Sequence, residues 1–290
     1  MPMEFRAGSF QFQFPRPTLI MGILNVTPDS FSDGGCYLDT ESAVERAYCM
    51  AQAGADIIDV GGESTRPGAE PVHPEEELRR VLPVIEKMKE RISIPISIDT
   101  RKVKVAGQAL KCGASIINDV EACREDDEMG RLVAGEGAGY IVMHMKGNPG
   151  TMQKAPVYDD VVDAVQKFFE SCLDRLNHVG VSLNQIVLDV GIGFGKTLEH
   201  NLELLANLEI FKKNHRPLLL GVSRKSFMSK LLKVEVSERL PAGIACTCWA
   251  VQSGVEIIRT HDVAETMQAI RMLEAIGSQK SRSDECSRHC

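Results

Sequence analysis

Eight short apolar runs along the chain each end in a polar or charged residue, and a segment with helical character follows each one. The runs and the residues that close them are LIMGILN (Asn25), ADIIDV (Asp59), IPISID (Asp99), ASIIND (Asn118, Asp119), GYIVMHM (His144), QIVLD (Asp189), PLLLGVSRK (Ser223, Lys225) and VEIIRTH (Arg259, His261). Eight strand–helix units are typical of a (β/α)8 barrel, which carries its chemistry at the C-terminal ends of its strands. We therefore predict a single-domain α/β TIM barrel whose active site contains these closing residues.

Length and composition are those of one globular enzyme domain. The chain has 290 residues, of which 43% are hydrophobic, and α/β barrels run to about 250 residues as one unit. A net charge of −7 argues against nucleic-acid or anionic-membrane partners. No apolar stretch approaches the roughly 18 residues of a membrane span, and the start MPMEFRAGSF has no signal-peptide apolar segment. We expect a cytoplasmic enzyme that acts on small molecules.

The nine cysteines are an odd number and show no metal-ligand spacing. The closest pair, Cys246 and Cys248, lies in an alanine-rich helical segment, so we interpret the cysteines as free thiols in a reducing compartment. The sequence also lacks an HExxH or Cys/His/His pattern, which argues against a tightly bound structural metal.

The two ends of the chain differ from the barrel region. Residues 10–14 (FQFQF) alternate apolar and polar side chains, which predicts a strand that forms a hairpin with residues 5–9 and plugs the bottom of the barrel. Beyond Gly277 the tail SQKSRSDECSRHC has no apolar periodicity. We expect an N-terminal hairpin over 1–17, a barrel over 18–277 and a disordered tail over 278–290.

Two loops after the predicted strands are rich in glycine, hydroxyl and turn-forming residues. The first runs from Asn25 to Gly35 and the second from Gly61 to Gly68, where Ser64, Thr65 and Arg66 are anion-binding types. Well-capped connections or surface turns with an incidental arginine are equally compatible with these two segments alone. A third segment, GIGFGKT from Gly191, is not a P-loop, because only three residues separate Gly191 from Gly195.

The polar residues at the strand ends suit a particular ligand. Asp99, Asn118 and Asp189 close three strands, and Lys225 follows a fourth. Any one of them could merely cap the next helix. Together they present carboxylates, an amide and an ammonium that match the donors and acceptors of a flat, guanine-like heterocycle. Arg259 and His261 add positive charge at strand 8, where barrels often bind phosphate.

Eight stretches together resemble the dihydropteroate synthases of the pterin-binding barrel family. They are GILNVTPDSFSDGG (22–35), DVGGESTRPGA (59–69), SIDT (97–100), IIND (116–119), MHMKGNPGTMQ (143–153), LDVGIGFGK (188–196), GVSRKSF (221–227) and RTHDV (259–263). They occur in family order from strand 1 to strand 8, and the first two are highly specific. The resemblance implies condensation of 6-hydroxymethyl-7,8-dihydropterin diphosphate with 4-aminobenzoate, by a dissociative substitution, to give 7,8-dihydropteroate and pyrophosphate.

The resemblance also implies a role for each matching residue. Asp99, Asn118, Asp189 and Lys225 would bind the pterin; Thr65, Arg66, Arg259 and His261 the diphosphate; Phe31, Pro67, Phe194 and Ser223 the aminobenzoate; and Asn25 would be the protein ligand of Mg²⁺. Asp99, Lys225, Arg259 and His261 would be catalytic, and the family suggests a homodimer formed through barrel helices.

Two positions depart from the family pattern. Val190 follows Asp189 where the family usually has proline, and Glu121-Ala122 stand where Ser-Gly is common. Neither departure falls on a residue with an assigned chemical role, although Glu121 adds negative charge near the barrel mouth. Two alternatives remain at this stage: a pterin-binding paralogue without activity, and a corrinoid-linked methyltransferase on the same barrel, which would not be expected to carry the NVTPDSFSDGG loop.

Overall fold

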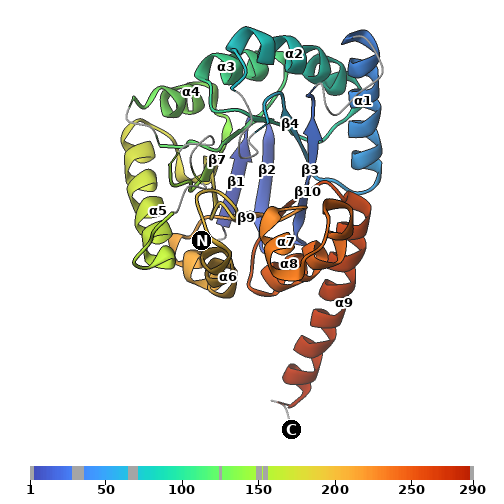
Figure 1. The fold of residues 1–290 in the computed structure, drawn as a ribbon, viewed down its shortest axis with the longest axis vertical. Coiled ribbons are helices and arrows are strands. Elements are labelled where there is room, and N and C mark those ends of the chain that lie inside the picture. The colour runs from blue at the N-terminus through green and yellow to red at the C-terminus, as the bar shows by residue number, and fades with distance from the viewer. Residues whose placement is uncertain are drawn as a thin grey trace.

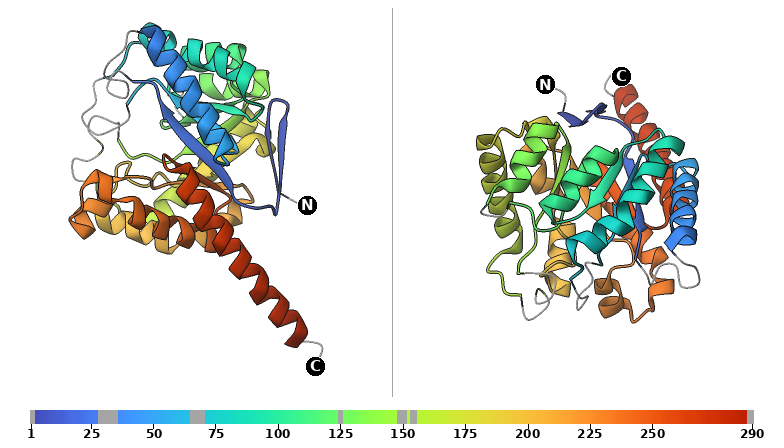
Figure 2. Two further views of the ribbon diagram at one scale, coloured as in Figure 1. Left: turned by 90° about the vertical axis from the view of Figure 1, so that its right-hand side faces the viewer. Right: turned by 90° about the horizontal axis from the view of Figure 1, so that it is seen from above.

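The structure, a computed structural model, describes residues 3–27, 36–64, 71–123, 126–147, 152 and 156–287. Eight parallel strands close into a barrel in the order β10-β3-β4-β5-β6-β7-β8-β9, and the helices cover its outside (Figures 1 and 2). A separate antiparallel pair, β1 with β2, precedes the barrel. The predicted fold class is therefore confirmed. Within the described ranges no helix is both long and apolar enough to cross a membrane.

The elements follow the predicted alternation of strand and helix. The strands are β1 (Met3–Ala7), β2 (Phe10–Phe14), β3 (Leu19–Asn25), β4 (Ile57–Gly61), β5 (Ile96–Asp99), β6 (Ile116–Asp119), β7 (Gly139–Met143), β8 (Ile186–Asp189), β9 (Leu218–Gly221) and β10 (Ile257–Thr260). The helices are α1 (Cys36–Gln52), α2 (Pro74–Arg91), α3 (Val103–Cys112), α4 (Glu128–Glu136), α5 (Val161–His178), α6 (Leu198–Ala206), α7 (Ser226–Leu232), α8 (Leu240–Gln252) and α9 (Val263–Ser287). Short 3₁₀ turns are η2 (Leu183–Gln185), η3 (Leu208–Asn214) and η4 (Val236–Glu238).

The hairpin of β1 and β2 closes the bottom of the barrel. Phe5, Phe12 and Phe14 are buried in one cluster with barrel-lining residues of β3 and β4, such as Leu19 and Ile57. The alternation in FQFQF explains this, because successive strand side chains point to opposite faces and only one face meets the barrel. The plug predicted from the sequence is confirmed.

Each barrel strand changes character along its length. In β8, Val187 belongs to the apolar bottom cluster, whereas Asp189 two residues later is a buried carboxylate. In the same way β10 passes from Ile257 to Arg259. A step of two residues keeps a side chain on the same face of a strand. The barrel interior is therefore apolar at the bottom and polar at the mouth.

The C-terminal segment differs from the prediction of a disordered tail. Helix α9 continues past Gly277 as far as Ser287, and its end extends away from the barrel (Figures 1 and 2). The expectation rested on the absence of apolar periodicity, which is a requirement for packing and not for helix formation. Residues such as Gln279, Lys280 and Arg282 have good intrinsic helix propensity, and no proline ends the segment.

Candidate active site

Four positions form one row across neighbouring strands at the mouth of the barrel. Asn25 of β3 is in register with Gly61 of β4, Gly61 with Asp99 of β5, and Asp99 with Asn118 of β6. The row arises because each apolar run ends at the same height of the parallel sheet. A Cβ at Gly61 would lie 3.8 Å from both Asn25 Oδ1 and Asp99 Oδ2, so the glycine leaves room between these two oxygens.

Arg259 connects two carboxylates across the mouth. Its Nε donates to Asp59 Oδ2 at 2.6 Å, and its Nη2 donates to Asp99 Oδ2 at 2.7 Å. Asn118 Nδ2 donates to the same Asp59 oxygen at 3.0 Å. Asp59 of β4 thus joins the site, although the sequence analysis assigned it no role beyond closing an apolar run. Its position at a strand end was the available signal, but its partners could not be read from one chain.

Burial changes the acid–base properties of this cluster. Burial raises the pKa of Asp99 to about 7, although the nearby Arg259 guanidinium opposes the change. Asp59 is fully buried, and its Oδ1 and that of Asp99 have no hydrogen-bond partner within the part of the chain that the structure describes. Buried polar atoms without partners cost stability. Two such carboxylate oxygens at the mouth of the barrel therefore indicate a site where a ligand can donate hydrogen bonds to them.

Asp189 and Lys225 lie in the same polar layer. Asp189 is 6% exposed, and its Oδ1 accepts a hydrogen bond from Gly191 N at 2.8 Å. Burial raises the pKa of its carboxyl, whereas the nearby Lys225 ammonium opposes the change. Burial also lowers the pKa of Lys225 to about 8. The Lys225 ammonium donates to Ile192 O and lies 4.4 Å from the centre of the Phe194 ring. Two predicted pockets thus share this lysine.

The GIGFG segment is fixed by a lysine that the sequence analysis did not single out. Lys196 is 1% exposed, and its Nζ donates to the carbonyls of Gly191 (2.9 Å), Phe194 (3.0 Å) and His144 (3.2 Å) and contacts His144 Nδ1 at 2.9 Å. Burial lowers the pKa of Lys196 to about 7 and that of His144 to about 2. The Lys196 ammonium therefore stabilises the GIGFG loop by its hydrogen bonds to backbone carbonyls and is not free to bind a phosphate. This agrees with the rejection of a P-loop.

Glycine is required at two points of this loop. Gly191 and Gly195 have φ values of +66° and +62°. A Cβ on Gly191 would lie 2.0 Å from His144 O, and one on Gly195 would lie 2.3 Å from Lys146 O. The backbone therefore packs directly on the chain after β7, and Phe194 between them is presented to Lys225.

Ser223 and His261 form a pair at the ends of β9 and β10. Ser223 Oγ is 3.0 Å from His261 Nδ1 and accepts a hydrogen bond from His261 N at 3.2 Å. Burial lowers the pKa of His261 to about 3, and the nearby Arg259 adds to the effect. The imidazole is therefore neutral near pH 7 in the ligand-free site. The predicted diphosphate and aminobenzoate residues meet at this pair.

The remaining predicted residues lie outside the described part of the chain. They are Phe31 in the first loop and Thr65, Arg66 and Pro67 in the second. Of the predicted site, the structure therefore brings together the side chains that lie at the strand ends or in the loops that follow them: Asn25, Asp99, Asn118, Asp189, Phe194, Ser223, Lys225, Arg259 and His261.

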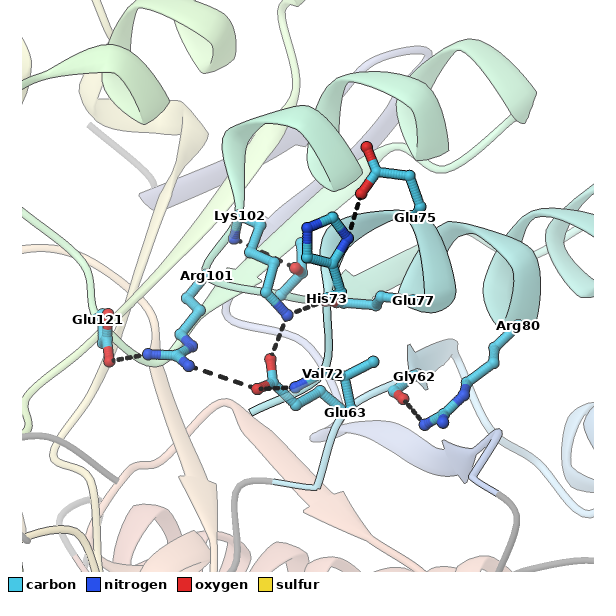
Figure 3. Close-up of polar contacts among 11 residues, drawn as sticks. Gly62, Glu63, Val72, His73, Glu75, Glu77, Arg80, Arg101, Lys102 and Glu121 are labelled. Atoms are coloured by element: carbon cyan, nitrogen blue, oxygen red, sulfur yellow. Dashed lines mark hydrogen bonds and ion pairs between the residues drawn. The ribbon is translucent and has the colours of Figure 1, made fainter. Parts of the chain in front are cut away.

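The two departures from the family pattern have distinct surroundings. Val190 is fully buried in the main hydrophobic core between barrel and helices, so its side chain faces away from the mouth. Glu121 accepts a hydrogen bond from Arg101 at 2.7 Å (Figure 3), and its backbone N donates to Asp119 Oδ1 at 2.9 Å. Ala122 packs in the main core.

Comparison with known proteins agrees with this geometry. Residues 21–261 match the family of pterin-binding enzymes. The dihydropteroate synthase of Escherichia coli K12 is 49% identical over 261 residues, which are 90% of this chain and 92% of the relative. A Yersinia pestis dihydropteroate synthase in complex with a sulfonamide drug superposes with a TM-score of 0.89 at 43% identity, covering 95% of this chain and 100% of that one.

A second solved structure is similar over the same extent. The Xanthomonas albilineans dihydropteroate synthase with 4-aminobenzoic acid has a TM-score of 0.88 and 39% identity, and the match covers 96% of this chain and 99% of that one. The similarity thus spans both the barrel and the strand ends that form the mouth. The chain belongs to the dihydropteroate synthases, the transferases of folate biosynthesis within the pterin-binding enzyme family.

Proposed function

We propose that this dihydropteroate synthase binds the pterin diphosphate in the polar mouth of the barrel and 4-aminobenzoate against Phe194 and Ser223. The observation that carries the proposal is the buried Asp189 carboxylate, which has Lys225 beside it. A carboxylate that faces two adjacent N–H donors suits the pyrimidine edge of a pterin. Asn118, on the row next to Asp99, supplies a further amide to the same ring.

Arg259 of β10 and His261, which directly follows β10, suit the leaving diphosphate. Arg259 lies within the mouth, and the His261 imidazole is neutral there because its pKa is about 3. A diphosphate beside His261 would raise this pKa and favour the charged form. We assign Arg259 and His261, with Thr65 and Arg66, to the diphosphate. The two arginines, and His261 once it is protonated, stabilise the negative charge that develops as the C–O bond breaks, and Thr65 offers a hydroxyl donor.

The order of bond changes follows from the groups available. The exocyclic carbon loses diphosphate first, and the pterin-stabilised cation that results is then attacked by the arylamine nitrogen, which releases a proton. Asp99, in its ionised form, lies where it offsets the developing cation. A weakly basic arylamine needs no strong general base.

Asn25 is a fitting but weak ligand for Mg²⁺. Its Oδ1 faces the space left by Gly61, opposite the Asp99 carboxylate, and Mg²⁺ prefers oxygen ligands together with substrate phosphates. In the described ranges no group of three or more His, Cys, Asp or Glu side chains could hold a metal alone. When bound, Mg²⁺ would neutralise charge on the diphosphate. We therefore expect turnover, but not folding, to need the ion.

We also propose that the chain forms a homodimer through the helices that follow β9 and β10. Large apolar side chains remain about half exposed there: Leu231 and Leu232 of α7, Trp249 of α8, and Met272 and Ile276 of α9. Large exposed apolar side chains favour self-association, because contact with a second copy removes them from water. Sedimentation analysis should give twice the chain mass, and replacement of Trp249 and Met272 by serine should shift it to the monomer.

A direct assay tests the catalytic proposal. The protein is incubated with pterin diphosphate and 4-aminobenzoate, with and without Mg²⁺, and pyrophosphate release is measured together with formation of dihydropteroate. We expect both products in equal amounts, and only when both substrates and the ion are present. Pterin binding without any turnover would instead identify a non-catalytic pterin-binding protein and refute the proposal.

A further inference from the structure

The peptide group that joins Ile192 to Gly193 connects the barrel mouth to helix α6. Its C=O accepts a hydrogen bond from the Lys225 ammonium, and its N–H donates to Asn201 Oδ1 at 2.7 Å. A Cβ on Gly193 would lie 3.1 Å from Lys225 Cδ, so the lysine side chain lies directly against this peptide. Because a peptide group is planar, the direction of its N–H fixes the direction of its C=O. Asn201 is therefore linked to Lys225, although the proposed chemistry does not use it.

This peptide is the centre of a tight turn. Phe194 N donates to Gly191 O at 3.1 Å, which closes a β-turn over residues 191–194. Gly193 has a φ of +83° and the φ of Ile192 is not positive, a combination typical of a type II turn. In a type I turn the central peptide is rotated, so that its C=O and N–H point the opposite way. Since glycine adopts both signs of φ, the partners of the peptide decide between the two turns.

Asn201 fixes the peptide from the side of its N–H. The residue is 2% exposed, and its Nδ2 donates to Thr197 O at 2.6 Å, which directs Oδ1 toward the N–H of Gly193. Thr197 is the N-cap of α6, and its hydroxyl accepts a hydrogen bond from His200 N at 3.3 Å. The acceptor is thus held by the start of a helix on the outside of the barrel. This arrangement favours the type II turn, because in that turn the N–H points toward α6.

Lys196 holds the two ends of the turn but not its centre. Its Nζ donates to the carbonyls of Gly191 and Phe194, which lie on either side of the central peptide. Loss of the Asn201 amide would therefore leave the ends of the turn in place and allow the central peptide to rotate. After rotation an N–H, in place of the C=O, would face the Lys225 ammonium. Two donors that face each other repel, so the lysine would have to move.

A displaced Lys225 has a second partner close by. The Asp189 carboxylate attracts its ammonium, and in the proposed function this carboxylate accepts hydrogen bonds from the pterin. Ile192 O thus keeps the lysine from occupying an acceptor that the ligand needs. Building on the proposed function, we propose that Asn201 is a positioning residue for pterin binding, which acts on Lys225 through the peptide between Ile192 and Gly193.

Calorimetry with pterin diphosphate and Mg²⁺ tests the proposal on three variants. Asn201→Leu has a side chain of similar size without an acceptor, and it fills the space in which water could replace the amide. Asn201→Asp keeps Oδ1. Asn214→Leu is the matched control, because the Asn214 amide also accepts one hydrogen bond and donates one to a backbone carbonyl, both at 2.8 Å, but lies in η3. We expect pterin affinity to fall about tenfold in Asn201→Leu and less than about twofold in the other two.

A double-mutant cycle with Lys225 separates positioning from a general loss of structure. Lys225→Met should weaken pterin binding more than Asn201→Leu, and the combined variant should bind no more weakly than Lys225→Met. The aminobenzoate KM of Asn201→Leu, measured at saturating pterin diphosphate, should change less than about twofold, since Lys196 still holds Phe194.

Gly193→Ala tests the same peptide from within the turn, and it serves where Asn201→Leu does not fold. A side chain at this position disfavours the positive φ of the type II turn, so pterin affinity should again fall about tenfold. Unchanged pterin affinity, an equal rise in the aminobenzoate KM, or an additive effect with Lys225→Met would overturn the proposal alone. Unchanged pterin affinity in Lys225→Met itself would refute the proposed pterin site, and the role of Asn201 with it.

Discussion

The two ends of the barrel are built from the same strands and have opposite properties. At the bottom, Phe5 and Phe12 of the hairpin pack against Leu19 and Ile57 in an apolar cluster. At the mouth, a step of two residues along the same strands places carboxylates, an amide and an arginine in a buried layer. The bottom stabilises the fold, whereas the mouth holds oxygens without partners that a ligand can satisfy.

The apolar bottom explains why the strand ends can carry polar, functional side chains while the barrel stays folded. A buried charge without a partner lowers the stability of a fold, and here Arg259 offsets this by pairing with both Asp59 and Asp99. The apolar layer below is complete without these residues. A mutation at the bottom should therefore lower stability and leave activity, whereas a mutation at the mouth should lower activity and, where it removes the cation of a buried carboxylate, stability as well.

Arg259→Met should have the largest effect on turnover. It removes the charge proposed to stabilise the leaving diphosphate, so the rate should fall about a thousandfold. It also leaves Asp59 and Asp99 without their cation, so urea unfolding should show a loss of about 3–5 kcal/mol. Adding Asp99→Asn should recover part of the stability and none of the activity. Recovery of activity together with stability would mean that Arg259 is only structural.

Phe5→Ala tests the apolar bottom of the barrel, where we expect a loss of stability without a loss of activity. Phe5 is fully buried in the bottom cluster and stacks on Phe12 with ring centres 6.0 Å apart. Its removal should lower the free energy of unfolding by about 3–5 kcal/mol. At temperatures well below melting, kcat and both KM values should remain within a factor of about two, since no ligand group is touched. Strong loss of kcat in the folded variant would show that the two ends are coupled.

A smaller, pH-dependent effect on stability is expected from His144, which directly follows β7 and contacts Lys196. Its pKa is about 2 in the folded chain against 6.5 ordinarily, so below pH 6.5 the unfolded chain binds a proton that the folded chain does not. Stability is therefore lost as pH falls. His144→Asn keeps an acceptor for Lys196 but does not titrate. Between pH 7 and pH 5 the wild type should lose about 2 kcal/mol more than the variant in urea unfolding. Parallel pH profiles would contradict the assignment.

The fold and most of the mouth could be predicted from the sequence for one physical reason. A strand of a parallel barrel is apolar on both faces, so a polar residue that ends it is conspicuous, and all strands end at the same face. Asp99, Asn118 and Asp189 were found in this way. The two loops and the roles of Phe31, Thr65, Arg66 and Pro67 remain predictions.

Other features depend on partners that are distant in the chain. The spacing around Lys196 excludes a P-loop, but its role as the donor to three carbonyl oxygens needs the fold. Asp59 could be recognised as the polar residue at the end of the second apolar run, but its partner Arg259 lies 200 residues away in the sequence. Glu121 could be recognised as an added charge, but its pairing with Arg101 needs the fold. The helix beyond Gly277 was missed because periodicity reports packing and not helix formation.

The central claim is that the polar mouth, and Asp189 above all, binds the pterin. Asp189→Asn keeps an oxygen that can accept from Gly191 N, so the melting temperature should change little. It replaces a second acceptor by a donor, which mispairs one pterin N–H, so calorimetry with a pterin ligand should show affinity weakened by about tenfold or more. An unchanged pterin affinity in a folded Asp189→Asn variant would remove Asp189 from the pocket and contradict the account.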